Sequence, residues 1–152
     1  MTETSWALRP ADAADFEMIA ELKKTVLRAD LIRLGRYDED RVRQRLRDSF
    51  DPRYASLVVV RDEVAGCVTV RPGHDCLWLE HFYLAPRHQG RGLGTAILRT
   101  VLARADAQRL PVRLVVFQGS AARRLYERHG FRLEREDPVD AVLVRQPAAC
   151  SA

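Results

Sequence analysis

The apolar residues in the first third of the chain follow a strand-like and then a helical spacing. Residues 6–9 fit a short strand, and Asp12 or Asp15 can cap the helix after it. That helix has apolar residues at helical intervals, namely Phe16, Ile19, Leu22, Val26 and Leu27. The pattern breaks near Gly35, and Asp38 can cap a second helix. The buried side of this second helix is expected to carry Val42, Leu46 and Phe50.

The rest of the chain alternates between β-branched runs and helical patterns. Residues 56–60 and 64–70 flank a short polar stretch and predict a hairpin, and residues 76–86 form a third extended run. A helix over 93–108 follows, and its apolar stripe comprises Ile97, Leu98, Val101, Leu102 and Ala105. The last elements expected are an apolar central strand at 112–117, a short helix within 120–130, and closing strands at 131–136 and 141–146.

Size and composition are those of one folded domain. The chain has 152 residues, of which 47% are hydrophobic, so we expect a single α/β domain over residues 1–152. The first residues lack the apolar core of a secretion signal, and no apolar run approaches the length of a membrane span. This pattern predicts a cytoplasmic protein without a membrane partner.

Charge and cysteine content narrow the choice of partners. The net charge is +4, but the arginines are scattered among acids, so no nucleic-acid partner is expected and DNA binding is the weakest interpretation. Cys67, Cys76 and Cys150 are odd in number and widely spaced, which indicates neither a disulfide framework nor a zinc site. No histidine pairs with a carboxylate at helical spacing, so we predict no metal cofactor. Cys67 is expected in the core.

Three alternating glycines stand directly before the helix over 93–108. Gly90, Gly92 and Gly94 allow close approach of the backbone, and a helix start offers unpaired N–H groups to an anion such as phosphate. The spacing fits neither the P-loop, which needs a lysine after the last glycine, nor the dinucleotide fingerprint, which follows a first strand. A tight turn without a ligand is the alternative.

The loop and a second motif together resemble a known family. Residues 89–94, Gln-Gly-Arg-Gly-Leu-Gly, resemble motif A (Q/R-x-x-G-x-G/A) of the GNAT superfamily of acyl-CoA-dependent N-acetyltransferases. The stretch SAARRLYERHGF resembles that family's A-x-x-L-Y-x-x-x-G-F helix through Ala122, Leu125, Tyr126, Gly130 and Phe131. The resemblance implies one GNAT-like domain, with a mixed, mostly antiparallel sheet of about six or seven strands and about four flanking helices. It also implies a splay between strands four and five.

The same resemblance implies where acetyl-CoA binds as co-substrate. The family's glycine loop holds the pyrophosphate, and its fourth strand pairs with the pantetheine arm. The family often has an asparagine where this chain has Gly119, so that contact must come from Gln118, Ser120 or backbone. Arg123 could reach the phosphates or lie on a solvated helix face. The residues expected to bind acetyl-CoA are Phe82, Tyr83, Leu84, Gln89, Gly90, Arg91, Gly92, Leu93, Gly94, Thr95, Gln118, Ser120 and Arg123.

Two residues are assigned catalytic roles. Tyr126 matches the family's tyrosine near the CoA sulfur and would act as general acid; a core aromatic is the alternative. Glu80 lies in an otherwise apolar strand, where the family often has a base that deprotonates the amine. The alternatives are a Glu80 that faces solvent or pairs with an arginine, with His81 or a bound water as base. Glu80 and His81 are expected on opposite faces of the strand.

The predicted function is transfer of an acetyl group from acetyl-CoA to a primary amine of a small molecule or peptide, by direct attack. A non-catalytic acyl-CoA-binding or regulatory module is the alternative, and a homodimer is left open. The first two helices usually wall the acceptor site in this family. The side chains there that could bind a cation, or only pair with nearby arginines, are Asp30, Tyr37, Asp38, Glu39 and Asp40.

Overall fold

A computed structural model of the chain describes residues 5–148. Contacts along its backbone group the chain into two compact units. Unit 1 joins the chain up to Thr69 with His81–Arg91, and unit 2 joins Val70–Glu80 with the chain from Gly92 onward. The division therefore passes through two strands, after Thr69 and after Glu80, and through the glycine loop after Arg91.

The described residues form seven strands in the hydrogen-bonded order β1-β2-β3-β4-β5-β7-β6. Neighbours pair antiparallel in β1–β2, β2–β3, β5–β7 and β6–β7, whereas β4 and β5 pair in parallel. The recorded β4–β5 register is confined to two residue pairs at the start of each strand, as expected of strands that separate further along. This confirms the predicted mixed, mostly antiparallel fold. The strands are β1 (Trp6–Pro10), β2 (Ala55–Val60), β3 (Glu63–Pro72), β4 (Leu77–Leu84), β5 (Val112–Phe117), β6 (Arg132–Glu136) and β7 (Asp140–Arg145).

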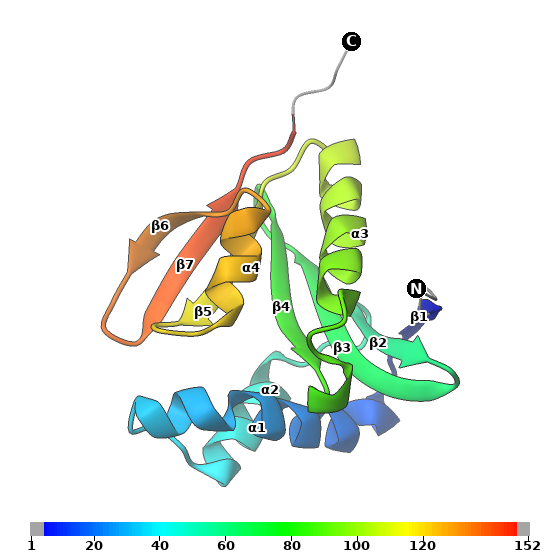
Figure 1. The fold of residues 1–152 in the computed structure, drawn as a ribbon, viewed down its shortest axis with the longest axis vertical. Helices are drawn as coiled ribbons and strands as arrows, with labels where there is room; N and C mark the ends of the chain where they lie inside the picture. The colour runs from blue at the N-terminus through cyan, green and yellow to red at the C-terminus, as the bar shows by residue number, and fades with distance from the viewer. Residues whose placement is uncertain (1–4, 149–152) are drawn as a thin grey trace. The chain divides into compact units, whose positions relative to one another are not determined.

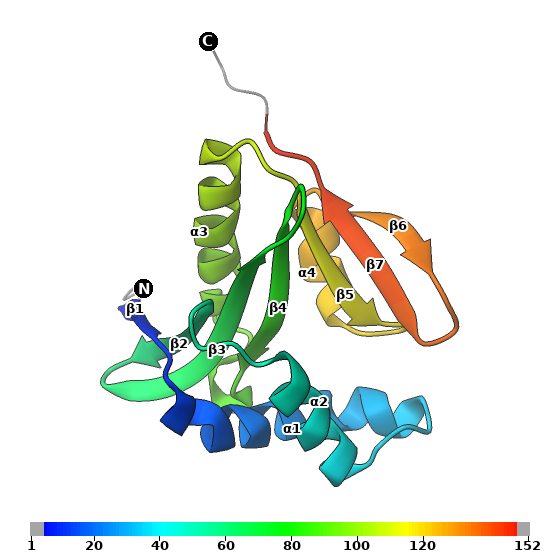
Figure 2. The ribbon, with the colours of Figure 1, turned by 180° about the vertical axis from the view of Figure 1, so that it is seen from behind.

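Unit 1 contains two helices, α1 (Phe16–Arg33) and α2 (Glu39–Ser49), which lie side by side in both views (Figures 1 and 2). A short 3-10 turn precedes α1, where Asp12 and Asp15 form a reciprocal capping box. Gly35 adopts a φ of +69° just after α1, and Asp38 caps α2 by accepting a bond from the Arg41 N–H. These are the boundaries that the sequence predicted.

The core of unit 1 lies between these helices and the first strands. The β2–β3 hairpin turns through Arg61 and Asp62, both at positive φ. Gly66 on β3 permits close packing, because a Cβ there would lie 2.2 Å from the Tyr83 carbonyl oxygen of β4. The buried cluster comprises Ala11, Ile19, Ala20, Leu46, Ala55, Leu57 and Cys67.

Unit 2 contains α3 (Leu93–Ala107) and α4 (Ala122–Arg128), which lie on the same side of strands β5 and β7 in both views (Figures 1 and 2). The predicted apolar stripe of α3 is buried, and Ile97 and Leu98 are fully enclosed. Arg145 on β7 pairs with Asp106 at the end of α3, with Nη1 2.8 Å from Oδ1. No helix among the described residues is long and apolar enough to cross a membrane.

Candidate functional site

The glycine loop is tied to the end of β4. A 3-10 turn (Pro86–His88) follows the strand, and Gln89 comes directly after it. The Gln89 side chain donates from Nε2 to the Leu84 carbonyl oxygen at 2.8 Å. This bond fixes the start of the loop against the strand. The expected role of Gln89 toward the cofactor stays a prediction.

The first two of the three glycines in the loop have the geometry of an anion cradle. Gly90 and Gly92 adopt φ of +73° and +81°, and a Cβ built on either would meet no atom within 4 Å. Gly92 precedes the first residue of α3 without a side-chain cap, so no side chain occupies the N–H groups of the first turn. Arg91 between the glycines is exposed, and no described residue forms an ion pair with it. Open space, free N–H groups and a positive charge fit a phosphate.

The last residues of β4 are partly buried in unit 1. Phe82, Tyr83 and Leu84 are each intermediate in exposure. The Tyr83 side chain packs against the buried cluster of that unit. The Leu84 carbonyl oxygen already accepts the Gln89 bond.

His81 interrupts the regular backbone of β4. Its φ is +46°, an uncommon conformation for a residue with a Cβ and a local source of strain. Its Nε2 lies 2.9 Å from the Ser49 hydroxyl oxygen at the end of α2. Its carbonyl oxygen accepts a bond from the Cys67 thiol at 3.1 Å. Burial raises the pKa of Cys67 to about 12, so this thiol stays protonated and serves as a core donor, as predicted for a core cysteine.

Glu80, one residue earlier, is paired with an arginine. Arg71 on β3 donates to Glu80 Oε1 from Nε at 2.9 Å and from Nη2 at 2.5 Å. The pair raises the pKa of Arg71, whose guanidinium also lies 5.9 Å from the centre of the Trp78 ring. Both bonds end on Oε1, and no other described residue bonds to the carboxylate. Oε2 is therefore not engaged by a described residue, while Oε1 is anchored.

Tyr126 is buried on α4 with its ring against Phe131. The ring centres are 5.5 Å apart in an edge-on arrangement, and 7% of Tyr126 is exposed. No described residue hydrogen-bonds to its hydroxyl group. The structure has no fully buried side-chain oxygen or nitrogen without a partner among its described residues, so this hydroxyl retains access to solvent. Burial raises the pKa of Tyr126 well above its usual value, which keeps the proton in place at neutral pH.

The side chains around α4 that were predicted to bind acetyl-CoA form hydrogen bonds or an ion pair within unit 2. Gln118 Nε2 donates to Glu136 at 2.9 Å and to the Asp137 carbonyl oxygen at 3.0 Å, in the β6–β7 hairpin. The Ser120 hydroxyl accepts from the Ala122 N–H at 3.2 Å and helps to start α4. Arg123 lies 3.7 Å from Glu127 one turn later. A role of these three residues toward acetyl-CoA stays a prediction.

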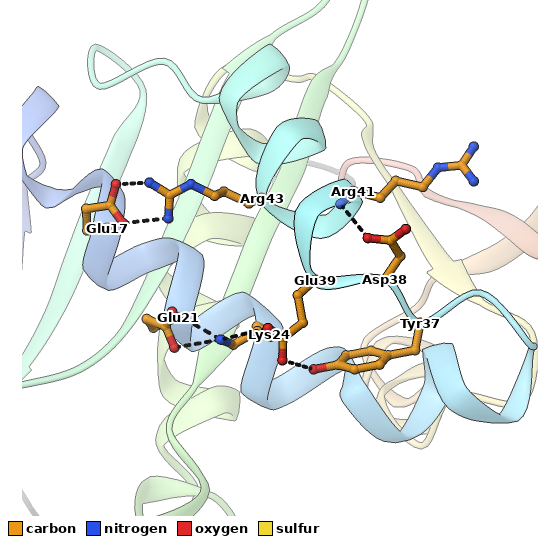
Figure 3. A network of polar contacts seen from close by, with 8 residues as sticks. All are labelled: Glu17, Glu21, Lys24, Tyr37, Asp38, Glu39, Arg41 and Arg43. Atoms are coloured by element: carbon orange, nitrogen blue, oxygen red, sulfur yellow. Dashed lines mark hydrogen bonds and ion pairs between the residues drawn. The ribbon is translucent and has the colours of Figure 1, made fainter.

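The acidic side chains at α1 and α2 are largely paired within the protein (Figure 3). Asp30 accepts a 2.7 Å bond from Arg33. Glu39 accepts a bond from the Tyr37 hydroxyl at 3.1 Å and lies 3.9 Å from Lys24 Nζ (Figure 3). A hollow of about 160 Å³ lies here, lined by Ala20, Glu21, Lys24, Glu39, Asp40, Val42 and Arg43.

Sequence reasoning missed Lys23. This lysine is only 8% exposed, on the face of α1 that also buries Ile19 and Ala20. Its position four residues after Ile19, within the apolar stripe, was the signal that could have found it. The residues that the structure describes contain no group of three or more histidine, cysteine or acidic side chains able to hold a metal ion; Cys150 lies outside them.

The sequence matches the model of one known protein family. The model of the acetyltransferase (GNAT) family matches residues 17–131, which is more than half of the chain. No curated protein matches the sequence significantly.

Three solved structures share the fold at low sequence identity. PaiA N-acetyltransferase from Thermoplasma acidophilum, in complex with coenzyme A, has a TM-score of 0.74 at 17% identity and covers 93% of this chain and 99% of its own. An acetyltransferase from Thermus thermophilus has a TM-score of 0.73 at 23% identity, with coverages of 96% and 99%. The ribosomal-protein-S18-alanine N-acetyltransferase from Escherichia coli has a TM-score of 0.72 at 15% identity and covers 97% of each chain.

Proposed function

The chain belongs to the GNAT acetyltransferase family, and on that premise we propose that it transfers an acetyl group from acetyl-CoA to a primary amine. The acceptor is a small molecule or peptide, and the amine attacks directly. The observation that carries the proposal is the family match together with a glycine loop whose geometry fits a phosphate. Residues 1–152 would act as one N-acetyltransferase domain.

The loop residues would bind the pyrophosphate of acetyl-CoA. When bound, acetyl-CoA supplies the activated thioester. Gly90 and Gly92 leave room for phosphate oxygens beside the backbone, and the first turn of α3 offers N–H donors to them. Arg91 adds a positive charge from an exposed position. Gln89 would act indirectly, by holding the loop to β4.

Tyr126 would serve as the general acid. Its ring is fixed against Phe131, its hydroxyl group is not engaged by a described residue, and its pKa is raised by burial. A phenol in this state can donate its proton to a leaving thiolate, and it is protonated in every neutral buffer.

Glu80 would take the proton of the attacking amine, directly or through water. Arg71 orients the carboxylate through Oε1, which leaves Oε2 as the accepting atom. The arginine pairing that the sequence left as an alternative is thus compatible with a basic role for the other oxygen. His81, held by Ser49, or a bound water would replace Glu80 if that role fails.

The experiment that tests the proposal is a screen of acetyl-CoA consumption over a broad panel of primary amines, with product identified by mass. Acetylated product with free CoA formed in equal amount supports the proposal. Thermal stabilisation by acetyl-CoA without turnover of any amine would favour the non-catalytic acyl-CoA-binding module. A cytoplasmic location, and the homodimer that the sequence left open, stay predictions.

A further inference from the structure

Lys23 is a largely buried lysine whose ammonium group has no partner among the described residues and retains access to solvent. It is 92% enclosed, being 8% exposed, yet no described residue forms a hydrogen bond or ion pair with it. The adjacent Lys24 differs, because its Nζ lies 3.1 Å from Glu21 and 3.9 Å from Glu39. A buried cation normally acquires a counter-ion from its own chain, since burying it alone is costly. Lys23 has none among the described residues.

The charged side chain whose electrostatic field acts on Lys23 is that of Arg45, which is also positive. Burial is the main cause that lowers the pKa of Lys23 to about 8, and the positive charge of Arg45 on α2 adds to it. Arg45 is exposed, and its guanidinium forms no ion pair with a described residue. The charge of Arg45 therefore acts on Lys23, and Arg45 is itself accessible to an anion.

Helix α2, which carries Arg45, contacts β4 within unit 1. Arg45 and Ser49 are four residues apart and share one face of α2. The Ser49 hydroxyl lies 2.9 Å from His81 Nε2 on β4. Arg45 thus lies on the face of α2 that reaches β4, and Lys23 lies on α1, which packs beside α2. These are the two helices that the family resemblance expects to wall the acceptor site. The acids of the same helices are largely neutralised by pairing.

We propose that Lys23 binds an anionic group of the acceptor, which is a small primary amine that also carries a carboxylate. The inference rests on the proposed acetyltransferase function. One buried ammonium neutralises one negative charge, which a carboxylate supplies and a phosphate, with nearly two, exceeds. The acceptor class is therefore amino-acid-like, and a polycationic amine is disfavoured.

The test compares matched acceptors in three proteins. Each amino acid of a panel is assayed beside its carboxamide and its decarboxylated amine, with wild type, Lys23→Met and the control Lys24→Met. Wild type is expected to favour the carboxylate in kcat/KM by about tenfold or more, the usual worth of a charge-assisted hydrogen bond. Lys23→Met should lose this preference, and Lys24→Met should keep it. A preference that survives in Lys23→Met, or equal rates with the carboxamide, overturns the proposal. So does a preferred aminoalkyl phosphate.

A binding measurement separates this proposal from the proposed function. N-acetyl amino acids and their amides are titrated into the same three proteins by calorimetry, with CoA present. Tighter binding of the acid by wild type and Lys24→Met, lost in Lys23→Met, supports the anion site even if no amine in the panel is acetylated. Such a result with no turnover would count against the proposed function alone. Acid and amide bound equally, or neither bound by wild type, overturns the anion site.

Discussion

Replacing Lys23 with methionine is expected to raise the free energy of unfolding at neutral pH. Methionine keeps an unbranched side chain of similar length and fills the same space on the buried face of α1, while it removes the charge. Burial first, and then the like charge of Arg45, lowers the pKa of Lys23 from 10.5 to about 8. The folded protein therefore disfavours the protonated lysine more than the unfolded chain does.

The lowered pKa of Lys23 fixes both the size and the pH dependence of this effect. One pKa unit corresponds to about 1.4 kcal/mol, so a fall from 10.5 to about 8 corresponds to about 3 kcal/mol at most. Between about pH 8 and 10.5 the unfolded chain binds this proton and the folded protein does not, so wild-type stability rises with pH there. The destabilisation caused by the protonated Lys23 is present in full below about pH 8 and is lost by about pH 10.5. We expect Lys23→Met to gain about 1–3 kcal/mol at neutral pH, and the gain to shrink as pH rises through this window.

Urea denaturation of wild type, Lys23→Met and Lys24→Met across this pH window measures the difference. Lys24 is paired with Glu21 at the surface, so its substitution should leave little pH-dependent difference from wild type. Apart from the substituted lysine itself, the groups that titrate at high pH are common to the three proteins and cancel in the comparison. A Lys23→Met protein that is less stable than wild type at neutral pH, or a difference that is independent of pH, would refute the reasoning.

Three further substitutions test the proposed roles. Gly92→Glu should abolish the thermal shift caused by acetyl-CoA, because it forces a side chain into the φ of +81° and puts negative charge beside the phosphate site; an undiminished shift would count against the loop. Tyr126→Phe should lower turnover by about 10²–10⁴-fold with acetyl-CoA affinity nearly intact, and unchanged turnover would leave Tyr126 a packing residue. Glu80→Gln should cut kcat/KM most at neutral pH and recover at high pH, where the amine is already neutral; wild-type rates throughout would sink the assignment.

Local signals in the sequence predicted the elements well. Capping aspartates and terminal glycines act through the nearest few residues, so Asp38 at the start of α2 and Gly35 after α1 lie where the pattern put them. Gly130 likewise adopts positive φ just after α4. The cap residue of α4 is Ala121, and the Ser120 hydroxyl accepts a bond from the first helical N–H from one position earlier.

The hydrogen-bond and ion-pair partners of polar side chains could be predicted less well from the sequence. Glu80 pairs with Arg71 because β3 and β4 are neighbours in the sheet. Which strands are neighbours depends on how the sheet assembles rather than on spacing along the chain. Gln89 was assigned to the cofactor because it occupies a motif position, but whether its amide faces the ligand or the Leu84 carbonyl depends on the path of the loop. The bulge-like φ of His81 has no local signal, because no glycine or asparagine marks it.

The two lysines of the chain illustrate what structure adds to a composition count. They are neighbours on one helix, yet a turn of about 100° per residue separates their faces, so Lys24 meets Glu21 while Lys23 enters the interior. The chain is rich in arginine and has few lysines. An apolar residue at position 23 would raise its free energy of unfolding, because it would remove the destabilisation that the charged Lys23 causes. A buried charge that lowers the stability of the free protein has a physical explanation when a bound ligand supplies the counter-ion that the chain lacks. For Lys23 that missing group is a single negative charge, which the acceptor would bring with it.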